Sequence, residues 1–267
     1  MTPTVTLGRA RLPHGLRVYA IGDVHGEADA LATILDDIQA DLRRRPVCDW
    51  RVVLTGDYID RGPESRSVLR MLAGLGPQDR TYCLRGNHEQ CLLDVIADPE
   101  ADCLYPWLLD GGLATLGSYG IDATLAEIDD AMARAVLRIM LIEALSPAEA
   151  GFLSALPHGV RFGDYFFAHA GIRPGVALEA QRPRDLMFIR EPFLDATHPH
   201  PAMVVHGHGT ATGIAGWGNR IALGSLDATE PAALVLEGAT AMTLRAGDLN
   251  GLAPDQAAIP AAIAEAA

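Results

Sequence analysis

The chain has 267 residues, of which 49% are hydrophobic and 21% charged, a composition typical of a folded globular protein rather than a disordered chain. Its formal net charge of −13 argues against binding to nucleic-acid backbones or anionic membranes, because such binding needs a basic surface. The charge leaves a phosphorylated substrate open, since bound metal ions can reverse the local field inside an acidic protein.

The sequence shows no signal for export or for membrane insertion. No apolar run approaches the ~18 residues of a membrane span, and the start MTPTVTLGRARLPHG lacks the apolar core of a signal peptide. Cysteines occur at four scattered positions without a CxxC pair, namely Cys48, Cys83, Cys91 and Cys103. We therefore expect reduced thiols and a cytoplasmic protein.

The first third of the chain alternates short apolar runs with segments of helical period, which predicts β-α-β-α-β. The predicted order is strand 16–23, helix 27–45, strand 51–57, helix 65–76 and strand 81–87. In open α/β sheets, ligands bind beyond the carboxyl ends of the strands. We therefore expect the turns after these three strands to meet at one edge of a sheet.

The remaining chain is predicted to hold a helical insert and further strands. Residues from about 91 to 156 read as mostly helical, so we expect an insert packed beside the sheet. Strand-like runs follow at 164–171, 202–209, 220–224 and 232–238. We expect one domain over residues 1–247 and a mobile, Ala-rich tail over residues 248–267.

Polar side chains gather at the predicted strand ends, in the segments GDVHG, GDYIDRG, RGNHE, HAG and HGH. They are Asp23, His25, Asp57, Asp60, Arg61, Arg85, Asn87, His88, His169, His206 and His208. Any one of them could be a turn residue or a hydrogen-bonded histidine, but the whole set would bury uncompensated charge in one crevice.

Metal coordination explains this set better than structural turns do. Mixed carboxylate, amide and imidazole donors suit Mn²⁺, Fe or Zn²⁺ better than Ca²⁺, which prefers oxygen ligands alone. The donors are too many for one tetrahedral ion. Two ions about 3.5–4 Å apart that share one carboxylate fit the inventory and the cleavage of phosphate esters.

The same motifs, in this order over residues 16–224, resemble the bacterial type of PPP serine/threonine phosphoprotein phosphatases of the calcineurin-like metallophosphoesterase superfamily. The resemblance implies an α/β fold with a β-sandwich core, flanking helices and a helical insert. It implies hydrolysis of phosphoserine and phosphothreonine in proteins by direct attack of a hydroxide that bridges two metal ions. Mn²⁺ is the favoured ion, with Fe and Zn²⁺ as alternatives.

The resemblance also implies a role for each site residue. The first ion would be held by Asp23, His25 and Asp57. The second would be held by Asp57, Asn87, His169 and His208, so that Asp57 bridges the two ions.

Four further positions receive roles from the same resemblance. His88 would donate a proton to the leaving group and would be oriented by Asp60, while Arg61 would bind the phosphoryl oxygens. Arg190 is our choice for a second phosphate-binding arginine, with Arg184 as the alternative. His206 is expected beside the metal ligands without binding an ion.

Two other functions stay open at this point. Symmetrical dinucleoside tetraphosphate hydrolases share the metal site but usually differ around the position of Asp60, so the intact GDYIDRG favours a phosphatase. A non-catalytic metal-binding sensor would be supported by the loss of a ligand or of His88, and no such loss is visible. The expected partner is a phosphorylated protein or another phosphoester, with neither nucleic acid nor membrane, and the oligomeric state is undetermined.

Overall fold

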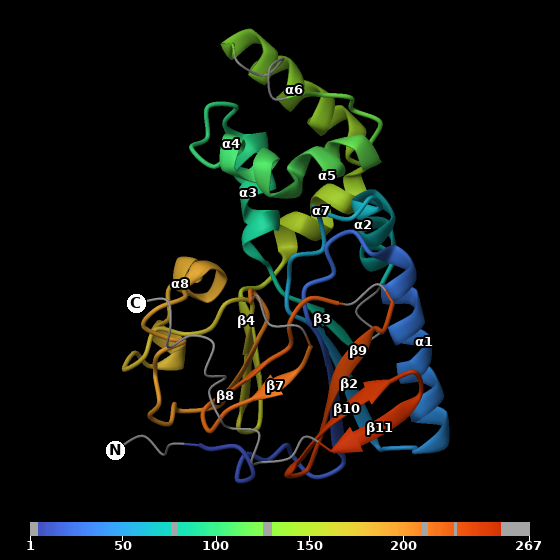
Figure 1. Cartoon of the computed structure of the whole chain (residues 1–267), viewed down its shortest axis with the longest axis vertical. Coiled ribbons are helices and arrows are strands. Elements are labelled where there is room, and N and C mark those ends of the chain that lie inside the picture. The colour runs from blue at the N-terminus through green and yellow to red at the C-terminus, as the bar shows by residue number, and fades with distance from the viewer. Residues whose placement is uncertain (1–4, 76–79, 125–129, 210–212, 227–228, 252–267) are drawn as a thin grey trace.

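Two β-sheets pack face to face, and helices cover their outer sides (Figure 1). The structure is a computed structural model that describes residues 5–75, 80–124, 130–209, 213–226 and 229–251. This arrangement confirms the predicted α/β fold with a β-sandwich core flanked by helices. Among the described residues, no helix is long and apolar enough to span a bilayer.

The first sheet has six strands in the order β11-β10-β9-β1-β2-β3. The strands are β1 (Leu16–Ile21), β2 (Asp49–Leu54), β3 (Thr81–Cys83), β9 (Ala232–Glu237), β10 (Thr240–Arg245) and β11 (Asp248–Gly251). Strands β1, β2 and β3 are parallel, with Ile21 beside Leu54 and Leu54 beside Cys83. This register brings the carboxyl ends of the three strands to one edge, as predicted.

The connections between these strands are the two predicted helices, α1 (Ala28–Arg44) and α2 (Ser65–Ala73). Strand β1 is apolar on both faces, because Tyr19 and Ile21 join the cluster that includes α1 while Val18 and Ala20 join the cluster between the sheets. Continuous burial is expected of a parallel strand that is covered on both sides.

The second sheet has five strands in the order β4-β5-β6-β8-β7. They are β4 (Gly159–Phe162), β5 (Tyr165–Ala168), β6 (Met203–His206), β7 (Ala215–Gly216) and β8 (Arg220–Ala222), and the short helices η3 (Leu178–Ala180) and α8 (Pro183–Phe188) lie between β5 and β6 in the chain. Strands β5 and β6 are parallel, with Ala168 beside His206. The turns after β5 and β6 therefore leave the sheet at the same edge.

The segment predicted as a helical insert is helical over most of its length. It contains α3 (Asn87–Ala97), α4 (Leu104–Trp107), the π-helical turn η2 (Leu108–Gly112), α5 (Leu113–Ser118), α6 (Ala131–Ala144) and α7 (Pro147–Ala155). These helices gather at one end of the molecule, with α6 farthest from the sheets (Figure 1). We call residues 87–155 the helical insert.

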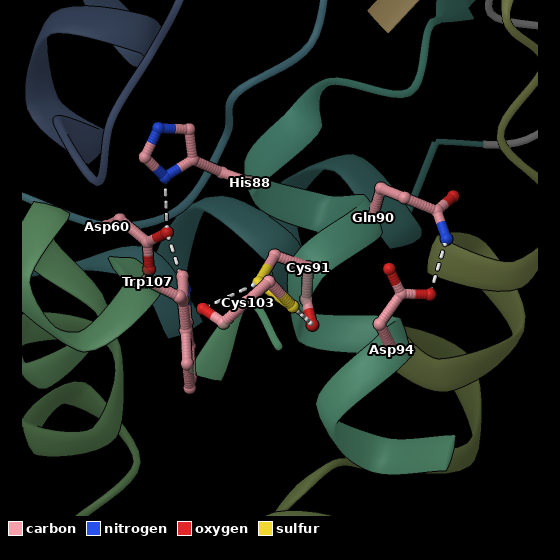
Figure 2. Close-up of a disulfide and its surroundings, with 7 residues drawn as sticks. All are labelled: Asp60, His88, Gln90, Cys91, Asp94, Cys103 and Trp107. Atoms are coloured by element: carbon pink, nitrogen blue, oxygen red, sulfur yellow. Dashed lines mark hydrogen bonds and ion pairs between the residues drawn. A yellow bond between two sulfur atoms is a disulfide. The ribbon is translucent and has the colours of Figure 1, made fainter. Parts of the chain in front are cut away.

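Two sequence expectations need correction. A disulfide joins Cys91 of α3 to Cys103 before α4, so the expectation of four reduced thiols is wrong for this pair (Figure 2), although Cys48 and Cys83 are free. The tail expected from residue 248 begins as strand β11, which pairs with β10. The fold of the insert and the pairing of a hairpin bring these residues together, and neither leaves a local sequence signal. The rest of the tail, residues 252–267, lies outside the described residues.

Candidate metal centre

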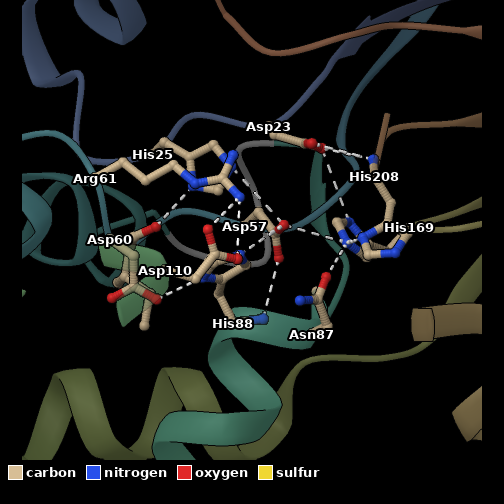
Figure 3. A network of polar contacts seen from close by, with 12 residues as sticks. Asp23, His25, Asp57, Asp60, Arg61, Asn87, His88, Asp110, His169 and His208 are labelled. Atoms are coloured by element: carbon tan, nitrogen blue, oxygen red, sulfur yellow. Dashed lines mark hydrogen bonds and ion pairs between the residues drawn. The ribbon is translucent and has the colours of Figure 1, made fainter. Parts of the chain in front are cut away.

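The strand-end loops hold their polar residues in backbone conformations that non-glycine residues seldom adopt. Positive φ angles occur at His25 (45°), Asp57 (54°), Asp60 (74°), Arg61 (66°) and His208 (48°). Such conformations cost free energy and cluster at functional sites, where the surrounding structure holds them in place. The strained positions of these three loops coincide with the predicted site (Figure 3).

Glu89, the last residue of RGNHE, fixes the backbone of the second loop. Its buried carboxylate accepts hydrogen bonds from the N–H groups of Asp57 (2.9 Å), Tyr58 (2.7 Å) and Gly86 (2.9 Å). Burial, reinforced by the charge of Asp57, raises the pKa of Glu89 to about 7. Glu89 is not among the residues predicted from the sequence, although its carboxylate directly follows Asn87 and His88 in the RGNHE motif.

A first group of metal donors consists of His25, Asp57 and His88, whose candidate ligand atoms all lie within 4.8 Å of one another. His25 Nδ1 lies 3.0 Å from the carbonyl oxygen of Ile59, which it can reach as a donor. That bond orients the ring and leaves His25 Nε2 available to an ion, 3.9 Å from Asp57 Oδ2.

A second group consists of Asp57, His169 and His208, again within 4.8 Å. His169 Nδ1 lies 3.0 Å from the carbonyl oxygen of Thr55, and His169 Nε2 lies 3.3 Å from Asp57 Oδ2 and 2.8 Å from Asn87 Oδ1. Asn87 therefore lies beside the second group, to whose ion the resemblance assigns it. Asp57 belongs to both groups, which fits a carboxylate shared by two ions.

Asp23 lies in the same buried network but outside both groups. Its carboxylate accepts the backbone N–H of His208 at 3.0 Å and lies 3.9 Å from His169 Nδ1. Burial raises the pKa of Asp23 to about 7. The resemblance assigns Asp23 to the first ion together with His25 and Asp57. In the structure, the donor group that contains His25 and Asp57 has His88 as its third member and not Asp23.

The charges of the network favour cations at its centre. Burial alone would lower the pKa of His169, but the negative charge of Asp57 outweighs burial and raises it to about 9. The raised pKa reflects the buried negative charge that surrounds His169. Oxygen and imidazole donors around a shared carboxylate fit transition-metal ions, which would compensate this charge.

His88 and Asp60 form the pair that the sequence analysis expected. His88 Nδ1 donates to Asp60 Oδ2 at 2.6 Å, and both residues are buried. Burial opposes protonation of His88, but the charge of Asp57 and the hydrogen bond to Asp60 raise its pKa to about 9. A histidine held in this way can retain a proton for donation.

Two residues of the helical insert complete the surroundings of Asp60. Trp107 Nε1 donates to Asp60 Oδ2 at 2.7 Å, and Thr115 Oγ1 donates to Asp60 Oδ1 at 2.5 Å. The Asp60–His88 pair and Trp107 are drawn together in Figure 2. Sequence reasoning missed Trp107 and Thr115, because an isolated tryptophan or threonine in a helical segment usually serves packing.

Arg61 lies at the mouth of the site with its side chain 49% exposed. Its Nη1 lies 3.1 Å from His25 Nε2, and its Nη2 donates to Asp110 Oδ1 and Oδ2 at 3.0 and 3.2 Å. The position beside the metal donors suits a group that binds phosphoryl oxygens. Asp110 was not among the residues predicted from the sequence.

The arginine candidates from the second half of the chain separate in the structure. Burial lowers the pKa of His208 to about 3, and the positive charge of Arg190 is among the further influences in that direction. Arg184 instead lies over the ring of Phe188 at 5.7 Å from its centroid.

The two other predicted residues lie outside the donor groups. His206 is buried, its Nδ1 lies 2.9 Å from the carbonyl oxygen of Gly207, and burial lowers its pKa to about 4. Arg85 donates to the backbone oxygens of Leu153 and Ser154, and so ties α7 to the end of β3. Its role in the structure is to anchor the insert.

Known proteins resemble this chain in sequence and in fold. A family model described as calcineurin-like phosphoesterase matches residues 16–236. A symmetrical bis(5'-nucleosyl)-tetraphosphatase of Dechloromonas aromatica is 33% identical over 174 residues, which cover 64% of this chain and 49% of that protein. The protein of the same name from Klebsiella pneumoniae is 38% identical over 109 residues, 35% of this chain and 36% of that protein.

The chain thus spans about a third to a half of the length of these relatives. They carry the name of the alternative activity and do not confirm the specific resemblance to phosphoprotein phosphatases. A cold-active protein tyrosine phosphatase of a Shewanella species has a similar fold, with a TM-score of 0.55, 19% identity, and coverage of 91% of this chain and 83% of that one.

Proposed function

The chain belongs to the calcineurin-like phosphoesterase family, and we propose that it is a metal-dependent hydrolase of phosphoesters. The observation that carries the proposal is the sharing of Asp57 between two groups of metal donors, directly beside the hydrogen-bonded pair of His88 and Asp60. The two donor groups supply places for two ions, and the His88–Asp60 pair supplies an acid. Hydrolysis of a phosphoester needs both functions.

Each side chain has a distinct task in this proposal. When bound, a pair of ions lowers the pKa of a coordinated water and neutralises phosphoryl charge. Arg61 binds the phosphoryl oxygens from the open side of the site. His88 carries its proton on Nε2 toward the leaving oxygen, while Asp60 accepts from Nδ1 and holds the ring in place.

The first substrate class is a dinucleoside tetraphosphate. Support comes from the curated relatives, which are named symmetrical bis(5'-nucleosyl)-tetraphosphatases and share 33–38% identity with parts of this chain. Symmetrical cleavage of such a substrate releases a nucleoside diphosphate, whose terminal phosphate is a good leaving group.

A second substrate class, phosphoserine or phosphothreonine in a protein, is favoured by one specific observation. Asp60 is fully buried and accepts from His88, Trp107 and Thr115, so the acid at His88 is firmly positioned. A serine alkoxide is a poor leaving group that must be protonated as it departs. This geometry serves an alkoxide more than it serves a diphosphate.

A substrate panel with Mn²⁺ tests these proposals. We expect hydrolysis of a dinucleoside tetraphosphate, a phosphoserine peptide or 4-nitrophenyl phosphate, and loss of activity after treatment with a chelator. The ratio of kcat/KM between the first two substrates decides the substrate class. Turnover of none of them by protein that binds two ions would contradict the proposed function and support the metal-binding sensor.

A further inference from the structure

The carboxylate of Asp110 lies where two substrate-facing groups converge. Arg61 Nη2 donates to both of its oxygens, and His88 Nε2 lies 3.6 Å from Asp110 Oδ2 (Figure 3). In the proposed function, Arg61 binds the phosphoryl group and His88 Nε2 faces the leaving oxygen. Asp110 therefore places a negative charge beside the path of the leaving group.

The backbone around Asp110 is fixed against the site. Within η2, Gly111 has a φ of 111°, and its carbonyl oxygen accepts the N–H of Arg61 at 3.3 Å. A Cβ atom at position 111 would lie 2.4 Å from Arg61 N, so this close approach needs glycine. Asp110 and Gly111 leave the helical conformation, so η2 is a kink between two helices, and this kink sets the position of Asp110.

The side chain of Asp110 can change its rotamer, although its backbone is fixed. It is 57% exposed, so it can rotate away from Arg61 while the turn stays in place. A phosphoryl group that binds Arg61 through Nη2 must displace the carboxylate, because both anions accept from this same nitrogen. After displacement the carboxylate still lies at the mouth of the site, because its backbone does not move.

We propose that Asp110 is a specificity-determining residue that disfavours leaving groups with negative charge next to the scissile oxygen and competes with phosphoryl groups for Arg61. The inference rests on the proposed function, which places the leaving oxygen at His88. It deepens that function, because it favours esters with an uncharged or cationic leaving group. A nucleoside diphosphate is an anionic leaving group and is penalised.

Two aryl phosphates with the same reacting group provide the test. We compare 4-nitrophenyl phosphate with 3-carboxy-4-nitrophenyl phosphate, whose leaving group carries one additional negative charge. The wild type should prefer the uncharged leaving group by about tenfold in kcat/KM, as expected for one like-charge contact at partial screening. Asp110→Asn should reduce this preference to about twofold.

The matched control is Asp102→Asn, which removes the same charge from an exposed position of the insert. It should retain the preference of the wild type. An equal preference in wild type and Asp110→Asn would overturn the proposal. Because Asp110→Asn only removes a charge at an exposed site without changing the length of the side chain, its fold should be unchanged by circular dichroism.

Binding of inorganic phosphate separates this inference from the proposed function. Calorimetric titration of the Mn²⁺-loaded protein should show tighter phosphate binding in Asp110→Asn, by about tenfold, and no change in Asp102→Asn. This measurement needs no turnover, so tighter binding supports Asp110 as a competitor for Arg61 even if no ester is hydrolysed. Equal phosphate affinity in an active enzyme would overturn the inference and leave the proposed function standing.

Discussion

The strand-end loops and the helical insert both contribute to the same site, but in different ways. The loops bring the candidate metal donors, of which His25 and Asp57 are buried and His208 is half-buried, and all three have positive φ angles. The insert brings residues of ordinary type, among them Trp107 and Thr115, that contact Asp60. In the proposed function, the loops therefore carry the chemistry, and the insert sets the position of the groups that assist it.

The difference also appears in burial. The donors of the loops lie between the sheet edge and the insert, whereas helix α6 of the insert exposes large apolar side chains such as Met132 and Ile139. The helical insert thus exposes apolar side chains on α6, while its Trp107 donates a hydrogen bond to the buried carboxylate of Asp60. Function in the insert thus depends on a few contacts and not on its overall composition.

The largest effect should come from the shared donor of the loops. Asp57→Asn weakens both donor groups, so activity on 4-nitrophenyl phosphate should fall below about 0.1% of wild type, because the lowered pKa of a coordinated water is lost. Metal content by mass spectrometry should fall in the same samples. Asp36→Asn, an exposed position on α1, is the control. Two ions retained in Asp57→Asn would contradict the shared role.

The next largest effect distinguishes an acid from a ligand at His88. His88→Asn should retain both ions and lose about 10²–10⁴-fold on a phosphoserine peptide, because a positioned acid contributes that much. The loss on 4-nitrophenyl phosphate should be far smaller, since nitrophenolate leaves almost unaided. His88 belongs to the first donor group by distance. Equal losses on both substrates with lost metal would therefore make it a ligand.

An intermediate effect is expected where the insert contacts the loops. Thr115→Val removes one donor to Asp60 at nearly unchanged side-chain size, and Trp107→Phe removes another with a smaller aromatic ring. Each should reduce kcat on the phosphoserine peptide about tenfold, the value of a hydrogen bond to a charged group. Activity on 4-nitrophenyl phosphate and metal content should change little, which a merely destabilised protein would not show. Trp50→Phe on β2 is the control, and equal losses on both substrates would contradict a positioning role.

The smallest effect on activity should come from the disulfide of the insert. The double variant Cys91→Ser, Cys103→Ser should lower the free energy of unfolding by about 2–3 kcal/mol, as expected for a short closed loop. Hydrogen exchange should rise in α3 and α4, while metal content and the loops after β1 and β2 stay unchanged. A loss of metal on removing the disulfide would show that the two regions are not energetically separate.

The sequence alone was sufficient for the sheet edge and for the polar residues that gather there. The short apolar runs predict β1, β2 and β3. Parallel strands joined by helices bring their carboxyl ends to the same edge of the sheet. The chemical types of Asp57, His169 and His208 were informative by themselves, because few roles other than coordination use such donors together. The strands β4, β7, β10 and β11 were not predicted, because their patterns are short or weak.

Only the tertiary structure assigned Trp107, Thr115 and Asp110 to the site. Trp107 and Thr115 lie 47 and 55 residues from Asp60 in the chain, so no local pattern links them to it. Cys91 and Cys103 pair only because α3 and α4 pack side by side. The spacing of apolar residues indicates which side of a helix or strand is buried. It does not indicate which residues of another element that side contacts. That choice is made when the insert packs against the sheet edge.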